Sequence, residues 1–352
     1  MPLNQNKPVI IWLLTGCALI FIMVIIGGIT RLTQSGLSIV EWNLLMGSIP
    51  PLNDAAWQEL FLKYQNSPQY QLVNYHFSLE EFKSIFWWEY IHRLFGRFIG
   101  IVFFVPFLFF LLTKKLSKPL IRKLLILFAL GGFQGFLGWF MVKSGLVKDP
   151  AVSHYRLAAH LITAFITFGY TFWIALELWF EGKKEENPAL ELKPSVLALF
   201  AVVTLQIVYG AFVAGLRAGN LYTTFPKMGD EWMAESVSFA YAKFGFISLF
   251  ENPASVQFIH RCLAYAVVGL SFYVWRKANL SSNNPVKQAA NILLAVITGQ
   301  FLLGIFTLIY SVPVSLGVLH QAGAFVAFAA VIYLLFKSSF GKVKNSPDSL
   351  IR

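Results

Sequence analysis

Long runs of apolar residues dominate the chain, and polar residues gather in the intervals between them. Eight of these runs are long enough to cross the hydrocarbon core of a bilayer as a helix, which needs about 20 residues. The predicted spans cover residues 9–28, 87–112, 120–141, 155–180, 195–216, 256–275, 288–310 and 315–336. The first run is a full-length span with no small-residue cleavage site after it, unlike a cleaved signal peptide. The pattern predicts an all-α integral membrane protein.

Two polar intervals, 29–86 and 217–255, are much longer than the others. The first contains an amphipathic pattern at near-helical spacing, formed by Leu52, Trp57, Leu60, Phe61 and Tyr64. It predicts a helix that lies on the membrane surface or on the bundle. Ser78 and Glu81 then form a capping box, and the helix that it opens is expected to continue directly into the second span. The interval 217–255 is rich in turn residues and predicts no regular element.

The two halves of the chain, 1–180 and 195–336, resemble a tandem repeat followed by a tail over 337–352. Short motifs occur in the same order in both halves, as in Gln134…Gly138 with Gln300…Gly304, Ile91-His-Arg93 with Ile259-His-Arg261, Ala164-Phe165 with Ala324-Phe325, and Gly28…Arg31 with Gly215…Arg217. A unit of four spans returns the chain to its starting side, so both copies have the same orientation. The sequence therefore predicts two four-helix bundles related by a pseudo-twofold axis along the membrane normal.

Composition supports the membrane assignment, because 57% of the residues are hydrophobic and only 13% are charged. The net charge of +11 could indicate a nucleic-acid partner, but more than half of the 28 Lys and Arg residues fall in the short segments on one side of the spans. This is the positive-inside pattern, so the partner is the lipid bilayer and both termini are expected inside. Cys17 and Cys262 both fall within spans, which argues against a disulfide.

Four of the six histidines occupy one recurring place, near the outer end of every second span. They are His92, His160, His260 and His320, and their spacing suggests two facing pairs. Imidazole is costly in lipid, and two helices that each present one imidazole can ligate a haem iron. The alternative for each ring is a hydrogen bond to a neighbouring helix. Four matched positions favour haem, held non-covalently because the sequence has no CxxCH motif. His154 and His76 lack counterparts and are expected to be interfacial and solvated.

The residue three positions before the histidine differs between the halves. Glu89 precedes His92, whereas Gln257 precedes His260. A carboxylate at one haem position and a neutral amide at the other suggest that one half does chemistry while the other carries electrons. The alternative is an interfacial or capping Glu. Arginines at outer helix ends are candidates for haem propionates, with snorkelling as the alternative. They are Arg31, Arg93, Arg97, Arg217 and Arg261.

These motifs together resemble those of the heme A synthase family over nearly the whole chain. The residues that carry the resemblance are Gly27-Gly-Ile-Thr-Arg31-Leu-Thr-Gln-Ser-Gly-Leu-Ser38, Glu89-Tyr-Ile-His92-Arg93, Tyr155-Arg-Leu-Ala-Ala-His160, Ala214-Gly-Leu-Arg-Ala-Gly-Asn220, Phe258-Ile-His260-Arg261 and Leu319-His320-Gln321. One departure is the outer interval 29–86, which contains no Cys pair. This places the chain with the branch of Gram-negative bacteria and mitochondria, and the N-terminus, which does not look like a transit peptide, favours a bacterial inner membrane.

The resemblance implies a reaction and a cofactor. The family oxidises a methyl group of haem O to the formyl group of haem A by successive hydroxylations. A haem b would be bound through His260 and His320, and the substrate haem O between His92 and His160, with Glu89 implicated in catalysis. An electron donor, the haem O synthase and terminal oxidase assembly proteins are the expected partners. The four histidines by themselves also fit a di-haem electron-transfer cytochrome or a haem transport or insertion factor.

Overall fold

The computed structural model describes residues 6–40, 49–145, 152–181 and 189–339. Within them, eight helices are long and apolar enough to cross a membrane, which confirms the eight predicted spans. They are α1 (Lys7–Leu32), α4 (Leu79–Leu112), α5 (Lys118–Gly145), α6 (His154–Phe180), α7 (Lys193–Gly215), α10 (Pro253–Leu280), α11 (Asn284–Ile309) and α12 (Val314–Ser339). Most are a few residues longer than predicted, because polar capping residues extend them beyond the apolar run.

The intervals between the spans hold shorter helices. They are α2 (Asp54–Gln65), α3 (Pro68–Leu72), η2 (Leu190–Leu192), η3 (Ala218–Asn220), α8 (Glu235–Phe244), η4 (Gly245–Ile247) and α9 (Ser248–Glu251). The described residues form no strand, only an isolated bridge between Met228 and Glu231. The fold is therefore all-α, as predicted. The predicted tail over 337–352 lies almost entirely outside the described residues.

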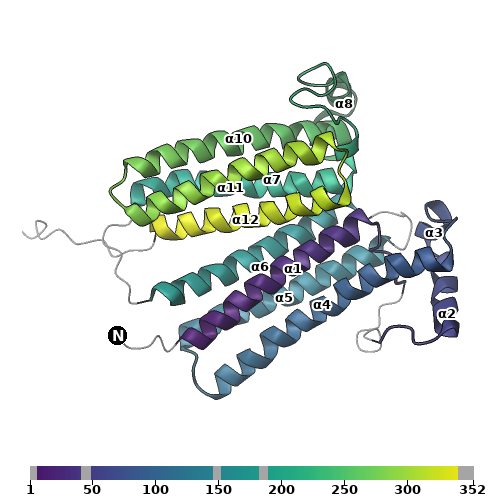
Figure 1. Ribbon diagram of the computed structural model, residues 1–352, viewed down its shortest axis with the longest axis horizontal. Helices are drawn as coiled ribbons and strands as arrows, with labels where there is room; N and C mark the ends of the chain where they lie inside the picture. Colours follow the sequence, from purple (N-terminus) through teal and green to yellow (C-terminus); the bar gives the residue numbers. More distant parts are fainter. Residues whose placement is uncertain (1–5, 41–48, 146–151, 182–188, 340–352) are drawn as a thin grey trace, which may run out of the picture.

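The long helices lie in two groups, with α1, α4, α5 and α6 in one and α7, α10, α11 and α12 in the other (Figure 1). Within the groups, α1 packs on α4 and α6, and α10 packs on α7 and α11. Between the groups, α6 contacts α7 and α12, while α1 contacts α12. The largest hydrophobic core lies at this junction, around Phe165, Phe168, Phe325 and Phe328. The pseudo-twofold relation between the groups stays a prediction.

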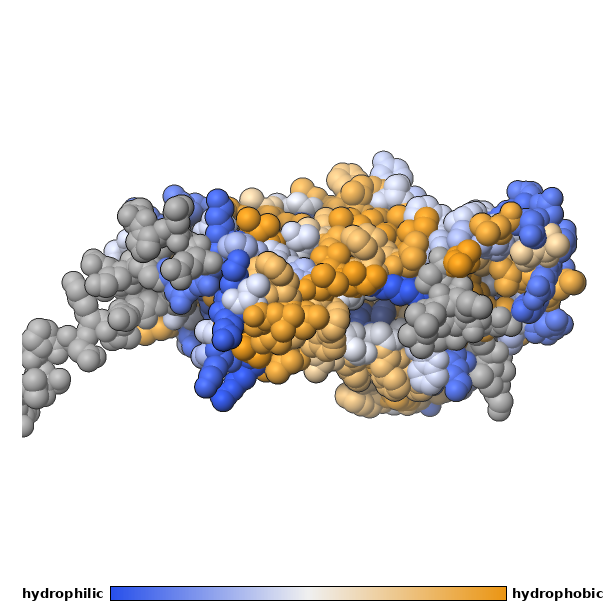
Figure 2. All heavy atoms as spheres, turned by 90° about the horizontal axis from the view of Figure 1, so that it is seen from below, coloured by the Kyte–Doolittle hydropathy of each residue, from blue (hydrophilic) through white to orange (hydrophobic). Residues whose placement is uncertain are grey.

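Apolar side chains form a broad belt between two polar ends of the molecule (Figure 2). Many large apolar side chains of the long helices are exposed, among them Phe104, Phe109 and Phe136. Such a surface would be a liability in water, but it matches the hydrocarbon of a bilayer. The belt thus fits the membrane setting that the composition predicts.

The outer end of α4 projects beyond the apolar belt and carries the packing surface for α2. The helix begins at Leu79, where Ser78 and Glu81 form both bonds of a capping box, as predicted. Trp57 and Phe61 of α2 pack on Phe82 of α4 rather than on lipid. Of the two predicted placements of this amphipathic helix, the structure shows the one on the bundle.

The predicted start of the outer amphipathic helix is wrong. Leu52 lies outside α2 and is 80% exposed, because Asn53 caps the helix after it. The Asn53 side chain accepts a hydrogen bond from the Ala56 backbone N–H, which fixes the first turn. At the other end of α2, burial raises the pKa of Tyr64 to about 12, so its hydroxyl stays neutral. That hydroxyl accepts a hydrogen bond from Asn74 at 2.8 Å.

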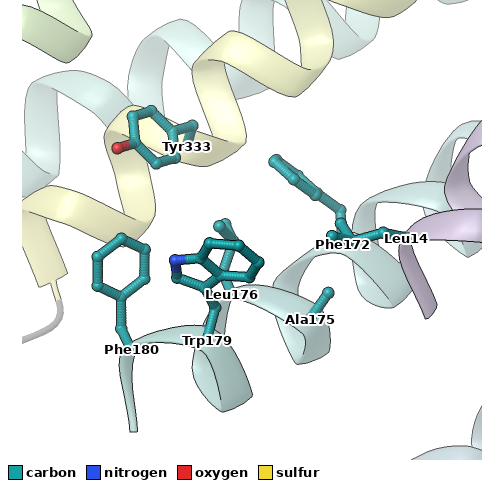
Figure 3. Close-up of a pocket in the computed structure, with 7 residues that line it drawn as sticks. All are labelled: Leu14, Phe172, Ala175, Leu176, Trp179, Phe180 and Tyr333. Atoms are coloured by element: carbon teal, nitrogen blue, oxygen red, sulfur yellow. The ribbon is translucent and has the colours of Figure 1, made fainter. Parts of the chain in front are cut away.

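Two apolar crevices lie where the two groups of helices meet. One, of about 260 Å³, is lined by α1, α6 and α12, and Figure 3 shows Trp179, Phe180 and Tyr333 around it. The other, of about 250 Å³, is lined by α6, α7 and α12. Histidines line neither crevice. The histidines lie elsewhere, in the N-terminal halves of α4, α6, α10 and α12.

Candidate functional site

The structure brings the four histidines together in two pairs. His92 on α4 and His160 on α6 lie close enough to interact electrostatically, and so do His260 on α10 and His320 on α12. These are the pairs that the sequence spacing suggests. Each pair joins two helices of one group, so each group in Figure 1 contains one pair of imidazoles.

Each of the four rings packs against a glycine on the neighbouring helix. A methyl group on Gly27, Gly138, Gly210 or Gly304 would lie 3.3, 3.2, 3.3 or 2.8 Å from the nearest ring atom of His92, His160, His260 or His320. Glycine at these positions lets the imidazole approach the helix backbone closely. The repeat in the sequence predicts Gly138 and Gly304 but not Gly27 and Gly210. The glycines that it matched instead, Gly28 and Gly215, lie against Gln321 and His154.

Three of these glycines follow a glutamine by one helical turn, and the glutamine lies against the same ring. The amide nitrogen of Gln134 lies 3.4 Å from the His160 ring, and that of Gln206 lies 3.4 Å from the His260 ring. The corresponding distance from Gln300 to His320 is 3.1 Å. The repeat in the sequence pairs Gln134 with Gln300. Gln206 is not predicted from it, although Gln206-Ile-Val-Tyr-Gly210 has the same spacing.

Buried polar atoms without a partner mark these places as binding sites. The Nδ1 atoms of His160 and His260 have no hydrogen-bond partner. Neither do the Oε1 atoms of the three glutamines, Gln134, Gln206 and Gln300. Such atoms are costly in an apolar interior, so their presence fits a site that binds a further group. The described residues hold no cluster of three or more His, Cys, Asp or Glu for a metal ion. Two imidazoles suffice for haem, because the porphyrin supplies the other ligands, so the donor set fits haem.

Glu89 is buried, and both of its carboxylate oxygens accept hydrogen bonds from neighbouring residues. Its Oε2 accepts hydrogen bonds from Ser38 Oγ at 2.7 Å and from the Ile39 backbone N–H at 2.9 Å. Its Oε1 accepts from Arg93 at 2.6 Å, and Arg93 also donates to the Ile39 carbonyl at 2.9 Å. The side chain of Glu89 is only 2% exposed. The carboxylate therefore ties the start of the outer loop to α4, one turn before His92.

In the second group of helices, the residues equivalent to Glu89 and Arg93 also hold a loop, but the residue equivalent to Glu89 donates a hydrogen bond instead of accepting one. Gln257, the counterpart of Glu89, donates to the Tyr222 carbonyl at 3.0 Å. Arg261, the counterpart of Arg93, donates to the carbonyls of Tyr222, Thr224 and Lys227. Both pairs thus hold the loop that follows the first helix of their group. The sequence contrast between Glu89 and Gln257 coincides with a change from an accepting to a donating contact.

The other candidate arginines lie at the junction of the groups or on α4. Arg31 donates to the carbonyls of Ala214 and Gly215 at 2.9 and 3.0 Å. Arg217, which has a left-handed backbone, donates to the side chain of Gln34. Arg97 follows Arg93 by one turn and is half-buried. The Nε atoms of Arg31 and Arg261 are buried without a hydrogen-bond partner, so each retains a donor that suits a carboxylate.

The remaining histidines and the cysteines lie apart from the two pairs. His154 packs on Gly215 at the junction of the groups, and its ring contacts Tyr155 and Phe212. His76 is exposed in the outer loop, as predicted. Cys17 and Cys262 are both free thiols within membrane-spanning helices.

A bundle of eight apolar helices with two pairs of half-buried histidines defines the class of polytopic membrane proteins with paired imidazoles between their helices. Within that class, the chain belongs to the COX15-CtaA family of cytochrome oxidase assembly proteins, whose family model matches residues 10–332.

Proteins similar in sequence match nearly the full chain and support the same family. "Heme A synthase" of Flavobacterium psychrophilum is 48% identical over 341 residues, which cover 96% of this chain and 100% of the relative. "Heme A synthase" of Nitrosospira multiformis is 46% identical over 332 residues, 94% of this chain and 93% of the relative. "Heme A synthase COX15" of Saccharomyces cerevisiae is 40% identical over 384 residues, 99% of this chain and 78% of the relative.

Proposed function

We propose that this chain is a heme A synthase, an oxidoreductase that converts haem O to haem A. The observation that carries the proposal is the two pairs of half-buried imidazoles, in which each ring packs on a glycine of the neighbouring helix. The proposed reaction is taken from the similar proteins that are named heme A synthase. In this reaction a methyl group of haem O becomes a formyl group through successive hydroxylations.

The two pairs of histidines have different roles in this proposal. His260 and His320 would hold a resident haem b, and His92 and His160 would hold the substrate haem O. When bound, haem b supplies an iron that accepts and passes on single electrons. The unpaired Nε atoms of Arg31 and Arg261 are the protein groups best suited to the propionates, with Arg93, Arg97 and Arg217 at the same outer level. These assignments rest on donor chemistry and burial.

Glu89 distinguishes the proposed substrate pair, His92 and His160, from the proposed haem b pair, His260 and His320. It places a carboxylate one turn before His92, where Gln257 places an uncharged amide one turn before His260. A carboxylate can accept and return a proton, whereas an amide cannot. Because its two oxygens also bind Ser38, Ile39 and Arg93, the same group fixes the first outer loop beside the substrate pair. We infer that the group of α1, α4, α5 and α6 does the chemistry.

The proposed setting is the cytoplasmic membrane of a bacterium, with both termini in the cytoplasm and the histidine pairs toward the periplasm. The eight spans, the excess of basic residues on one side and the bacterial relatives support this setting. An electron donor delivers electrons to haem b in this scheme. The haem O synthase and terminal oxidase assembly proteins are the proposed partners for supply of substrate and use of product.

The test is to express the chain together with a haem O synthase in aerobic cells and to identify the extracted haems by mass spectrometry. We expect formyl and hydroxymethyl products with the wild-type chain, and loss of both with His92→Ala or His160→Ala. His76→Ala, an exposed residue outside both pairs, is the matched control and should leave the products unchanged. Absence of both products with the wild type would refute the proposal that the chain is a heme A synthase. Two bound haems without either product would then identify the di-haem cytochrome.

A further inference from the structure

We propose that residues 241–247, the last turn of α8 and the whole of η4, anchor the second outer loop in the bilayer at the outer end of the helices. The partner of this anchor segment is the lipid boundary between headgroups and acyl chains. The segment contains no residue of the two histidine pairs. The proposal therefore concerns a separate surface of the protein and does not depend on the proposed reaction.

α8 packs on the bundle with its smaller side chains and leaves its large ones uncovered. Ala234 and Val237 are buried in a small cluster with Ala254 at the start of α10. Tyr241 and Phe244 follow Val237 by four and seven residues, so they continue the same side of the helix. They are nevertheless 54% and 56% exposed. The side that α8 presents to the bundle therefore extends past the protein and ends in two aromatic rings.

The residues that follow α8 enlarge this uncovered apolar surface. Phe246 is 68% exposed and Ile247 is 49% exposed. Lys243 is the only charged residue in the sequence of the anchor segment. Four large apolar side chains that lie exposed within seven residues are unfavourable in water and indicate an interaction surface. The first outer loop differs, because the aromatic side chains of α2 are buried on α4.

The position of α8 in the fold favours lipid as the partner. In Figure 1, α8 lies beside the outer end of α10, on the side away from the first group of helices, whereas α2 and α3 lie beyond the end of α4. The second outer loop also contacts the surface of the membrane-spanning helices, because Phe225 packs on Tyr265 of α10 and on Phe301 of α11. Tyr265 is itself exposed. The loop is thus continuous with the surface that meets the bilayer.

The side chains of the anchor segment suit the boundary between headgroups and acyl chains. Aromatic rings accumulate at this depth, and a lysine there keeps its ammonium among the headgroups while its stem covers apolar surface. The Nζ of Lys243 lies 5.2 Å from the centre of the Phe244 ring and 5.9 Å from that of Phe239. A positive charge next to exposed rings is typical of helices that lie in the interface and attract lipid phosphate.

The experiment measures how deep the anchor segment lies in a bilayer. The full-length chain with Cys17→Ser and Cys262→Ser receives one cysteine, by Phe246→Cys, Ile247→Cys or, as a control on α2, Glu59→Cys. A polarity-sensitive fluorophore is attached, and the protein is placed in vesicles of phosphatidylcholine and phosphatidylglycerol. Iodide on both sides quenches from water, and lipid spin-labelled near the headgroup quenches from the interface. We expect the labels at 246 and 247 to be quenched at least about twofold more by the lipid, and about twofold less by iodide, than the label at 59.

Two results would overturn the inference. Quenching at 246 and 247 that equals the quenching at 59 with both reagents would show that the segment lies in water. Protection from both reagents would show that it is covered by protein, either by a partner or by a second copy of the chain. A variant that does not fold lacks a cooperative thermal transition, and Tyr241→Cys then takes its place. Neither outcome depends on whether haem is bound or converted.

Discussion

Glu89 and Gln257 occupy equivalent positions in the two halves, but one accepts hydrogen bonds and the other donates one. The carboxylate accepts from a hydroxyl and a backbone N–H, whereas the amide donates to a backbone carbonyl. A carboxylate has no donor and an amide has two, so neither residue can replace the other without breaking a contact. The difference in charge is thus matched by a difference in the backbone group that each residue holds.

Replacing Glu89 with Gln should abolish turnover while leaving haem b in place. The variant loses the ion pair with Arg93 and puts a donor against donors at Ser38 and Ile39. We expect product to fall by at least about 100-fold, as for loss of a group that transfers protons. The measurement is the ratio of haem A to haem O by mass spectrometry, with haem b absorbance as the control. Full product formation would remove both the catalytic and the loop-fixing role of Glu89.

Adding one methyl group beside a ligand ring should weaken haem binding in proportion to the available space. A Cβ on Gly304 would lie 2.8 Å from the His320 ring, whereas one on Gly210 would lie 3.3 Å from the His260 ring. We therefore expect Gly304→Ala to lose more haem b than Gly210→Ala, because overpacking forces the ring to move. The haem b content per protein measures this. Gly299→Ala, whose Cβ would contact nothing within 4 Å, is the control.

At the scale of elements, the outer loops are attached to the helices that carry the first histidine of each pair. In the second group of helices Gln257 makes one contact to a loop carbonyl, and Arg261 makes three, at 2.7, 2.9 and 3.1 Å. The guanidinium can make all three at once because its donors lie in a fixed plane. Two side chains of α10 therefore hold the loop over 221–227, and Arg261 makes three of their four contacts.

Arg261→Met should make this loop accessible to proteases. We expect trypsin to cleave after Lys227 several times faster than in the wild type, since local opening exposes the backbone. Fragment masses from the detergent-solubilised protein identify the site. Arg276→Met, an exposed change at the opposite end of α10, should leave the cleavage rate unaltered. Equal rates in both variants would show that the loop is held by other contacts.

The elements that the sequence predicts well are those with a strong apolar pattern. All eight spans and the capped start of α4 follow directly from length, hydropathy and Ser78 with Glu81. The start of α2 is misplaced because Leu52 continues the apolar spacing past the cap at Asn53. Gln206 was missed because periodicity shows that a residue faces inward without showing which neighbouring helix it meets. That information depends on how α7 and α10 pack.

At the scale of the whole molecule, polar contacts at the outer end join the two groups of helices. Arg31 of α1 donates to two carbonyls at the end of α7, and Gln321 of α12 donates to the Val24 carbonyl of α1 at 2.9 Å. Unpaired carbonyls at a helix end attract cations, which favours the arginine. The crevice of Figure 3 and its counterpart lie along the same junction.

Arg31→Met should lower the stability of the whole protein. Two hydrogen bonds from a charged donor are lost, with an expected cost of about 2 kcal/mol. The midpoint of thermal unfolding in detergent, followed by tryptophan fluorescence, should decrease by several degrees. Arg122→Met, near the inner end of α5, is the control. An unchanged midpoint would show that the groups are held by apolar packing alone.

The proposed orientation predicts where the C-terminus lies. A green fluorescent protein fused after Arg352 should fluoresce, because it folds in the cytoplasm, and an alkaline phosphatase fused at the same place should be inactive. Fusions within the outer loop, after Asp230, should give the reverse. An active phosphatase at the C-terminus would invert the topology and place the histidine pairs on the cytoplasmic side.

The four glycine-seated rings also bear on why two similar halves share one chain. A symmetric dimer of a single four-helix unit would have to carry the same residue at both copies of every position. Joining the copies covalently removes that constraint, so each position can change alone. Glu89 in place of Gln257 is one such change, and Glu89 lies one turn before His92. In the proposed function, the fused chain can therefore bind haem b at one copy and the substrate haem at the other.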